Sequence, residues 1–175
     1  IPYRETMPWL ACFSFRETEV LAGESHQLVE TEIGKVGTSI CFESLFAGIA
    51  REETLKGAAF LLVLTNDSWF GRTQFARLHL MASRQRAIEN RRYVVQSSTT
   101  GISGIIDPYG RVVRELGIHE RGIVTGRIAP LHKITPYTRF GDWLAYLCAA
   151  FTLVALLVCR HEQKTRTKSR RKRRP

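Results

Sequence analysis

A chain of 175 residues can bury one good hydrophobic core and suits a single α/β domain. Its formal net charge is +10, but residues 160–175 hold nine basic residues and one acid and contribute +8 of that total. A nucleic-acid-binding domain carries its basic residues on a folded face. This distribution therefore argues against nucleic acid as a partner and indicates a charged appendage.

The first apolar stretch, Met7 to Phe15, has no clean strand or helix period and is expected to form a loop. Such a loop either packs on the core or dips into lipid and covers an apolar substrate, and the sequence leaves both open. The residues from His26 to Glu32 alternate weakly in polarity, and Gly34-Lys35 predicts a turn. We therefore expect a hairpin whose second strand is Val36 to Ile40.

Cys41 and Glu43 directly follow this strand, at a point where a helix is expected to begin. A thiol attacks as its thiolate, and the free N–H groups and dipole at a helix N-terminus favour that anion. The carboxyl end of a strand is also where ligands collect in α/β folds. Cys41 is therefore predicted to be a catalytic nucleophile, and the competing interpretation is a small residue buried in the core.

Leu45 to Lys56 is predicted to be a helix, with Arg51-Glu52-Glu53 facing solvent and Gly57 ending it. The continuous apolar run from Ala58 to Thr65 predicts a strand buried on both faces.

Polar and aromatic residues follow this buried strand, from Asn66 to Gly71. An α/β fold places binding groups at such a position, which makes Asn66, Trp69 and Phe70 candidate substrate-binding residues. The alternative is a plain turn in which Asn66 and Asp67 bond their own backbone and Trp69 fills a gap.

Thr73 to Arg92 is the longest predicted helix. The apolar residues expected to face the core are Phe75, Leu78, Met81 or Ala82, and Ile88. The polar positions of the helix include Arg77, Arg84 and Arg91. His79 and His119 have no second histidine at metal-ligand spacing, so both are expected to be solvated or satisfied within the core, and no metal site is predicted.

Several β segments complete the domain. They are Tyr93 to Ser97, Ile102 to Ile106, Arg111 to Val113 and Gly122 to Gly126, with a turn at Asp107-Pro108-Tyr109-Gly110. Helices and strands in mixed order predict an α/β or α+β layered domain.

Trp143 to Cys159 is a run of seventeen residues without a charge. This length reaches the short end of what a transmembrane helix needs, and little interrupts the apolar surface. Trp143 and Tyr146 suit an interfacial aromatic belt, and the basic tail after the run predicts a cytoplasmic C-terminus with the preceding domain on the opposite side. The expected domains are 1–139, a transmembrane helix at 140–159 and a basic cytoplasmic tail at 160–175.

A domain on the outer side needs a route across the membrane, yet the chain opens on Ile1-Pro2-Tyr3-Arg4 without a signal-peptide pattern. We therefore expect a C-terminal fragment of a longer membrane protein. Cys12, Cys148 and Cys159 have no evident disulfide context, and neither CxxC, HExxH, GxGxxG nor a P-loop is present. A thiol enzyme without a cofactor is the catalytic class that these features favour.

Four ordered blocks of sequence together resemble the carbon-nitrogen hydrolase (nitrilase) superfamily. They are Ser39-Ile40-Cys41-Phe42-Glu43, Leu64 to Gly71, Arg86 to Arg91, and Thr99 to Gly110. Tyr137 to Trp143 leads into the apolar run, and this feature narrows the resemblance to the apolipoprotein N-acyltransferases of bacterial inner membranes.

The resemblance implies a four-layer αββα sandwich and a Glu-Lys-Cys triad whose cysteine becomes a thioester. The family passes an acyl chain from a phospholipid to the α-amine of a diacylglyceryl-cysteine on a lipoprotein, at the membrane and without a cofactor. By motif, Cys41 is the nucleophile, Glu43 is a neighbouring acid that helps position it, and Trp69 and Phe70 line the acyl or substrate path. Phe42 stands where the family commonly has tyrosine.

The triad glutamate and lysine of the family precede the cysteine, and neither Lys35 nor Lys56 has the family context. We therefore expect the isolated chain to be inactive and the parent protein to be an acyltransferase. A nitrilase-like amidase that uses water as acceptor, and a non-catalytic membrane-anchored binding domain, remain the alternatives.

Overall fold

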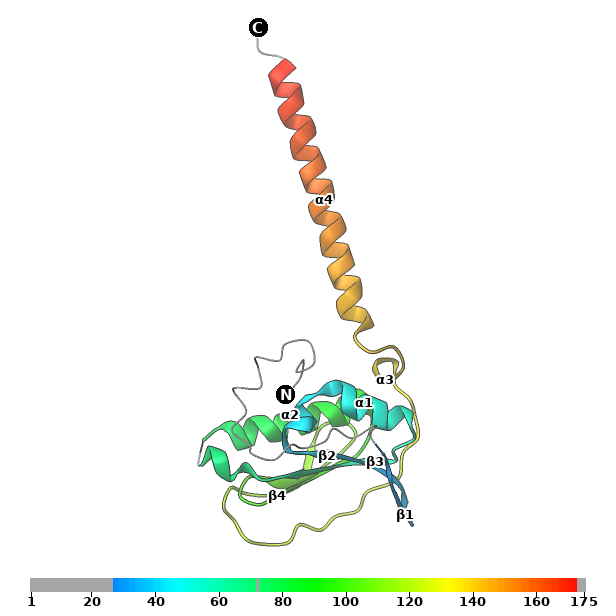
Figure 1. Cartoon of the computed structure of the whole chain (residues 1–175), viewed down its shortest axis with the longest axis vertical. Coiled ribbons are helices and arrows are strands. Elements are labelled where there is room, and N and C mark those ends of the chain that lie inside the picture. Colours follow the sequence, from blue (N-terminus) through cyan, green and yellow to red (C-terminus); the bar gives the residue numbers. More distant parts are fainter. Residues whose placement is uncertain (1–26, 72, 173–175) are drawn as a thin grey trace, which may run out of the picture.

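The computed structural model describes residues 27–71 and 73–172, with side chains described as far as residue 160. The predicted loop from Met7 to Phe15, with Cys12, lies outside the described residues. The described part is built on a six-stranded sheet, with two helices covering one face and an extended segment running below the other (Figure 1). The α/β class predicted from the sequence is confirmed.

The strands follow one another across the sheet in the order of the sequence. They are β1 (Val29–Thr31), β2 (Gly34–Ile40), β3 (Phe60–Thr65), β4 (Val94–Ser98), β5 (Ser103–Ile106) and β6 (Val112–Leu116). β2, β3 and β4 run parallel, whereas β1, β5 and β6 pair antiparallel to their neighbours. The carboxyl ends of β2, β3 and β4 therefore meet at one edge, and the residues that follow them are brought together there.

The helices connect and cover these strands. They are the 3-10 helix η2 (Cys41–Leu45), α1 (Ala47–Leu55), the 3-10 helix η3 (Asp67–Phe70), α2 (Phe75–Asn90), α3 (Pro136–Phe140) and α4 (Trp143–Lys172). Both parallel crossovers contain a helix, α1 between β2 and β3 and α2 between β3 and β4, as the geometry of parallel strands requires.

The predicted hairpin, the strand within Ala58 to Thr65 and the Asp107 to Gly110 turn are confirmed, although Leu64 on one face of that strand is 42% exposed. Two predictions about turns and strands are wrong. The hairpin pairs Thr31 with Gly34, so its turn is Glu32 and Ile33 rather than Gly34-Lys35. Gly122 to Gly126 forms no strand, because no strand among the described residues pairs with it, and Ile123 is 90% exposed.

The inner face of α2 also differs from the predicted stripe. Leu78, Met81 and Ile88 are about half exposed, and the buried face is instead Ala76, His79, Leu80, Ser83, Arg86, Ala87 and Asn90. Four of these seven are polar, so hydrophobicity could not mark the face that is buried.

Each buried polar side chain of α2 bonds a different part of the fold. Ser83 Oγ donates to Gln96 Oε1 of β4 at 2.6 Å, and Gln96 Nε2 donates to the Ile102 carbonyl at 2.9 Å. Asn90 Oδ1 accepts from Thr138 Oγ1 of α3 at 3.0 Å. This face of α2 is polar because its side chains make specific hydrogen bonds to the sheet and to α3. These bonds fix the position of α2 along the sheet.

On α1, the prediction that Arg51-Glu52-Glu53 faces solvent is wrong for Glu53, which is only 1% exposed. A Cβ on Gly37 would lie 2.6 Å from Glu53 Oε2, so β2 can pass under α1 at this point only because residue 37 is glycine.

The opposite face of the sheet is covered by the extended segment that follows β6. A small cluster of Val36, Ala59 and Phe60 packs there against Ile128. Arg92 is 1% exposed, and it donates to the Ala58 carbonyl at 2.6 Å and to the Lys133 carbonyl at 2.7 Å. Burial lowers the pKa of Arg92 from its ordinary value, and these carbonyl oxygens compensate the charge.

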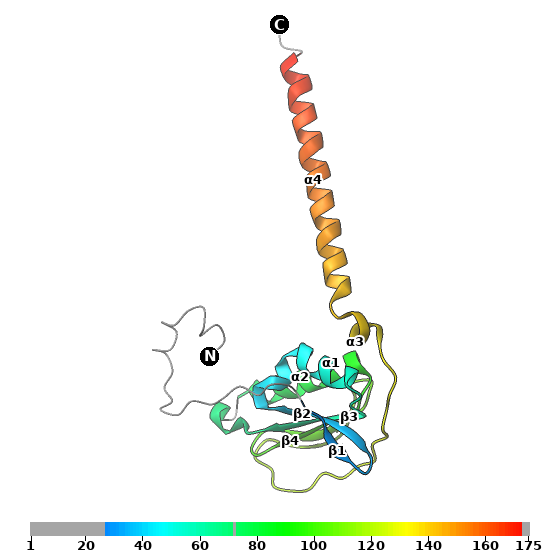
Figure 2. The same cartoon turned by 45° about the vertical axis from the view of Figure 1, so that its right-hand side comes forward.

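The described residues thus supply one helical layer and one sheet layer of the expected four-layer sandwich (Figure 2). The chain then returns to the helical layer through α3. Thr138 is fully buried, and Arg51 of α1 donates to the Arg139 carbonyl at 3.1 Å. The last turn of α2, α1 and α3 therefore form one hydrogen-bonded joint.

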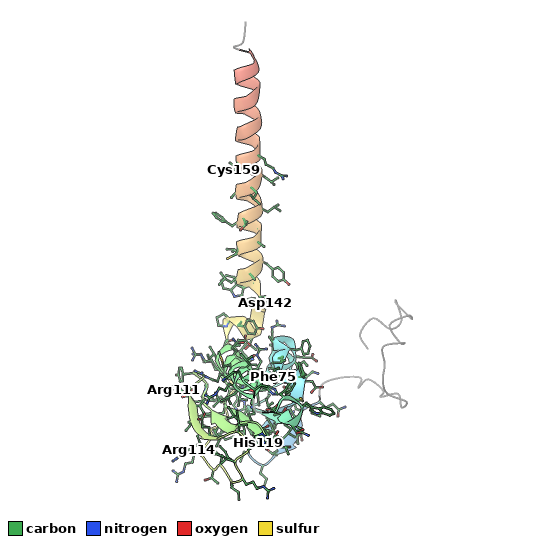
Figure 3. All side chains as sticks on the ribbon, turned by 90° about the vertical axis from the view of Figure 1, so that its left-hand side faces the viewer. Phe75, Arg111, Arg114, His119, Asp142 and Cys159 are labelled. Carbon is green, nitrogen blue, oxygen red and sulfur yellow. The ribbon has the colours of Figure 1, made fainter. Side chains whose placement is uncertain are left out.

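α4 begins directly after this joint and projects away from the domain (Figures 1 and 3). Its first 18 residues, Trp143–Arg160, are long and apolar enough to cross a membrane by length and composition, and no part of that window is buried inside the protein. Helix α4 starts three residues after the boundary at 140 that was expected from the sequence.

Gln96 offers a test of the polar connections between α2 and the sheet. Gln96→Ala leaves the Ser83 hydroxyl and the Ile102 carbonyl without their partner, and we expect it to lower the free energy of unfolding by about 2 kcal/mol or more. Gln85→Ala, the same change at an exposed position of α2, should cost less than about 0.5 kcal/mol. Denaturant unfolding followed by circular dichroism measures both, and equal costs for the two variants would contradict the assignment.

Candidate active site

Cys41 sits at a sharp corner between β2 and η2. Its φ is 52°, in the left-handed region that residues other than glycine rarely adopt. Such a conformation costs free energy and persists only where surrounding contacts hold it. The side chain is partly exposed, so the corner presents the sulfur at the carboxyl edge of the sheet.

Glu43 closes the corner from within. Its Oε2 accepts a hydrogen bond from the Ile40 backbone N–H at 2.7 Å, while the Glu43 carbonyl accepts from the Phe46 N–H at 3.0 Å. The carboxylate therefore caps the first turn of η2 and fixes the residue just before Cys41. This is a positioning contact, and it places an acidic side chain two residues from Cys41 on the chain.

A buried chain of polar groups lies behind Cys41. Ser44 Oγ donates to the Cys41 carbonyl at 2.9 Å, and His79 Nε2 lies 2.8 Å from Ser44 Oγ and 3.2 Å from the same carbonyl oxygen. On the far side of the ring, His79 Nδ1 lies 3.0 Å from Asp67 Oδ1. Ser44, His79 and Asp67 are each 1% exposed.

Asp67 is in turn held by two neighbouring strands. Its Oδ1 accepts from Thr65 Oγ1 at 2.9 Å, and its Oδ2 accepts from Ser98 Oγ at 3.1 Å. A Cβ on Gly101 would overlap Asp67 Oδ2, so glycine at that position makes room for the carboxylate. The ends of β3 and β4 thus converge on one buried acid.

A second residue of α2 holds the other end of η2. Arg86 Nη1 donates to the Leu45 carbonyl at 3.2 Å, and its Nη2 donates to Glu89 Oε1 at 3.0 Å. His79 and Arg86 are seven residues apart on one face of α2, so the two ends of η2 are both bonded to that helix.

Aromatic rings gather beside Cys41. Phe70 and Phe75 stack with ring centroids 3.6 Å apart, and Phe42 lies 5.8 Å from Phe75 and 6.2 Å from Phe70. Trp69 is 87% exposed and fills no gap. The cluster of Phe42, Phe70 and Phe75 gives the edge an apolar floor.

The structure therefore brings Cys41, Glu43 and Phe70 to one edge of the sheet, as the sequence predicts. Asn66 also lies there, but its Oδ1 accepts from the Ser68 N–H at 3.2 Å, the turn contact that was the alternative interpretation. Trp69 projects outward. Their predicted roles in catalysis and substrate binding stay predictions.

Three residues of the site were not among the predicted ones: Ser44, Asp67 and His79. His79 is satisfied within the core and His119 is exposed, as expected for both. The position of Asp67 just after a central strand was a usable signal. Nothing local in the sequence joins it to a histidine on the next helix. Within residues 27–71 and 73–160, no group of three metal-ligating side chains is found.

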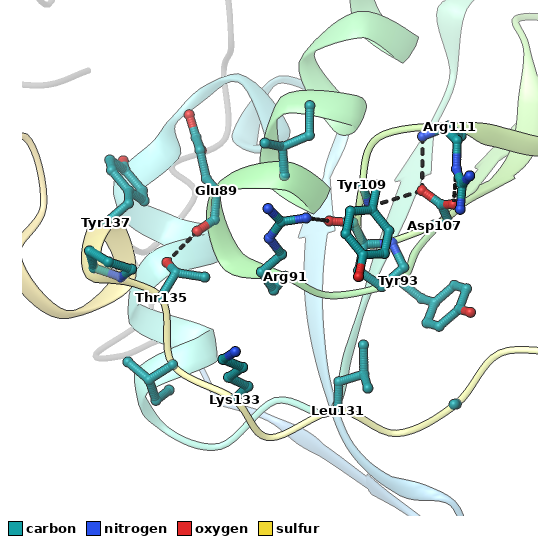
Figure 4. A pocket seen from close by; sticks show the side chains of 15 residues that line it. Glu89, Arg91, Tyr93, Asp107, Tyr109, Arg111, Leu131, Lys133, Thr135 and Tyr137 are labelled. Atoms are coloured by element: carbon teal, nitrogen blue, oxygen red, sulfur yellow. Dashed lines mark hydrogen bonds and ion pairs between the residues drawn. The ribbon is translucent and has the colours of Figure 1, made fainter.

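A separate pocket of about 880 Å³ lies at the opposite edge of the sheet (Figure 4). Tyr93 precedes β4 and Asp107 follows the antiparallel β5, so both lie at the amino end of β4, away from Cys41. Arg91 lies over the Tyr109 ring at 4.6 Å. The pocket combines cationic and aromatic side chains but holds none of the predicted site residues.

Two titrating groups line this pocket near α3. Burial raises the pKa of Glu89, Arg86 opposes that shift, and the negative charge of Asp142 adds to it. Burial also raises the pKa of Tyr137, with Glu89 and Asp142 adding to the shift. Asp107 differs, because burial would raise its pKa but hydrogen bonds from Arg111 and the Tyr109 N–H bring it below the ordinary 3.8.

The chain matches the model of the carbon-nitrogen hydrolase family over residues 2–136. A Gloeobacter violaceus protein named apolipoprotein N-acyltransferase is 34% identical over 167 residues, which is 91% of this chain and 32% of that protein. A protein of the same name from Methylococcus capsulatus is 41% identical over 115 residues, covering 63% of this chain and 22% of its own length. The chain therefore spans about a third or less of the curated relatives it matches.

Among solved structures, a carbon-nitrogen hydrolase from Helicobacter pylori G27 superposes with a TM-score of 0.51 at 18% identity. The match covers 58% of this chain and 43% of that protein. At this identity the likeness supports the fold alone.

Gly101 and Gly48 form a matched pair for testing the site. Gly101→Ala drives a methyl group into Asp67 and Ser98, and we expect it to destabilise the protein by about 2 kcal/mol or more. A Cβ on Gly48, within α1, meets nothing within 4 Å, so Gly48→Ala should stabilise by about 0.5–1 kcal/mol. Thermal unfolding of the two variants measures these changes in stability, which should have opposite signs. A Gly101→Ala variant as stable as wild type would contradict the close packing of Gly101 against Asp67.

Proposed function

This chain belongs to the carbon-nitrogen hydrolase family, and we propose that it carries the acyl-accepting cysteine of a lipoprotein N-acyltransferase. The observation that supports this most is the Cys41 corner: a partly exposed thiol, at the carboxyl edge of parallel strands, in a conformation that surrounding hydrogen bonds hold. The names of the relatives support acyl transfer to a lipoprotein as the reaction. The apolar residues around the thiol and helix α4 support a reaction that takes place at a membrane.

The proposed reaction has two steps at Cys41. The thiolate attacks the ester carbonyl of a phospholipid, the C–O bond breaks, and the lysophospholipid leaves as an alcohol after taking a proton. The free α-amine of a diacylglyceryl-cysteine on a lipoprotein then attacks the thioester. The C–S bond breaks, an amide forms, the amine loses a proton and the thiolate returns.

Each side chain at the edge has a proposed part in these steps. Glu43 positions the corner, while Phe70 with Phe42 and Phe75 gives an apolar floor along which an acyl chain can lie. Trp69 and Asn66, both exposed beside this floor, are proposed to contact substrate. The chemistry needs no cofactor, since the carbon that reacts is already activated as an ester.

The substrates place this reaction at a membrane. We propose that residues 140–159 anchor the domain as a transmembrane helix, with Trp143 and Tyr146 at the interface. The basic residues from 160 to 175 then lie in the cytoplasm, and the domain of residues 1–139 lies on the outer face of a bacterial inner membrane. The joint formed by α3 would keep the edge that bears Cys41 at a fixed height above the lipid.

The proposed transfer also needs a general base and a cation to stabilise the tetrahedral intermediate. Lys35 pairs with Glu30 at 3.3 Å and Lys56 with Glu52 at 2.7 Å, both on the outer surface. We therefore propose that the base and the cation come from residues outside this sequence, in keeping with the share of its relatives that the chain spans.

Replacement of the thiol tests the proposal. In the protein purified from its own membranes, Cys41→Ser should lower acyl transfer from phospholipid to a diacylglyceryl-cysteine peptide by at least about a thousandfold. Mass spectrometry should find an acyl group on the Cys41 peptide of the wild type before acceptor is added. Cys159→Ser is the control and should retain activity. Hydrolysis of small amides without lipid would instead favour an amidase, and full activity of Cys41→Ser would favour a non-catalytic binding domain.

The 175-residue chain alone provides a second test. Incubated in detergent micelles with phospholipid and a diacylglyceryl-cysteine peptide, it should give no turnover, because the nucleophile is present without its base. Mass spectrometry of the peptide measures whether any acyl group has been transferred. A Cys41 thioester that forms and turns over in this chain would contradict the need for residues from outside it.

A further inference from the structure

The contacts of the buried polar groups behind Cys41 indicate which ring nitrogens of His79 carry hydrogens. A carbonyl oxygen only accepts hydrogen bonds. The Cys41 carbonyl, Ser44 Oγ and His79 Nε2 lie within 3.2 Å of one another, and Ser44 supplies one hydrogen among the three. If that hydrogen is donated to Nε2, the carbonyl faces two lone pairs, so the contacts fit best with the hydrogen donated to the carbonyl. Unless Nε2 carries a hydrogen, its lone pair faces two acceptors, and Nε2–H is therefore the favourable state.

The other ring nitrogen faces a carboxylate whose oxygens are both acceptors. Asp67 Oδ1 receives the Thr65 hydroxyl and Oδ2 receives the Ser98 hydroxyl. An ionised carboxylate fits these contacts, and His79 Nδ1 at 3.0 Å must then donate to Oδ1. Both ring nitrogens carry hydrogens in this arrangement, and the ring is an imidazolium.

We propose that His79 is a positioning residue for Cys41, acting as a buried imidazolium paired with Asp67. The pair is neutral in sum, but its positive end faces the Cys41 corner and its negative end faces β3 and β4. The imidazolium and Ser44 together hold the Cys41 carbonyl and so stabilise the left-handed backbone, and the oriented charge favours the thiolate over the thiol.

The surroundings of the ring support a charged pair at this depth. Asp67 accepts hydrogen bonds from Thr65, His79 and Ser98, which is what a buried carboxylate needs to remain ionised. The charged groups nearest along the packed elements are committed elsewhere: Glu43 to the Ile40 N–H, and Arg86 to Leu45 and Glu89.

The role of His79 rests on the proposed function in one respect: it matters for acyl transfer only if Cys41 is the nucleophile. Alkylation of Cys41 by iodoacetamide needs neither phospholipid nor acceptor. Failure of acyl transfer and failure of the His79 assignment are therefore distinguishable in separate assays.

The test is the pH dependence of Cys41 alkylation, followed by peptide mass spectrometry on the full chain in micelles. His79→Gln keeps an amide donor toward the Cys41 carbonyl but removes the charge, and Asp67→Asn removes the partner that the imidazolium needs. Each should slow alkylation at pH 7 by about tenfold and move the rate profile about one unit to higher pH. The limiting rate at high pH should stay near that of the wild type.

Two controls separate charge from packing. Ser83→Ala removes a buried hydroxyl from the same face of α2 but keeps the ion pair, so its profile should stay within about a factor of two of the wild type. His132→Gln is the same change at an exposed position and should leave the profile unchanged. Superposition of the His79→Gln profile on the wild type overturns the proposal. If that variant does not fold, an Asp67→Asn profile equal to that of Ser83→Ala overturns it.

Discussion

The left-handed backbone of Cys41 is the constraint on which the rest of the site depends. It turns the chain from β2 into η2 within one residue and leaves the thiol at the open edge of the sheet. A non-glycine residue does not hold that conformation unaided. Here the Cys41 carbonyl is bonded by Ser44 and approached by His79, and Glu43 ties down the residue before it. The functional proposal follows from this geometry, because an acyl acceptor must be both exposed and fixed.

Helix α2 connects that corner to the rest of the fold. One face of this helix contacts η2 through His79 and Arg86, β4 through Ser83, and α3 through Asn90. A single element thus connects the nucleophile, the central sheet and the base of α4. Substrate lipids enter from the membrane in the proposed reaction, so a rigid connection between the anchor and the thiol has a clear use.

The sequence predicted the parts of the fold that depend on local patterns. The apolar run from Ala58 to Thr65 marked β3, and the short strand expected from Val36 to Ile40 marked the corner itself, since strand signals depend on neighbouring residues. The buried face of α2 was not predictable in this way. Leu78 and Met81 carry the helical apolar signal yet are exposed, while His79, Ser83 and Arg86 are buried because partners distant in sequence satisfy them. The strand expected at Gly122 to Gly126 failed for the related reason that a strand needs a partner.

Nitrogen-15 NMR of the histidine side chains tests the central claim most directly, since it reads the protons on the His79 ring in the unmodified chain. The account predicts that Nδ1 and Nε2 of His79 each show a one-bond coupling to hydrogen at pH 7, with slow exchange because the ring is 1% exposed. His132, which is exposed, serves as the reference. A His79 ring with one nitrogen free of hydrogen at this pH would contradict the account, because a bare Nε2 would turn a lone pair toward the Cys41 carbonyl and a bare Nδ1 would turn one toward the Asp67 carboxylate.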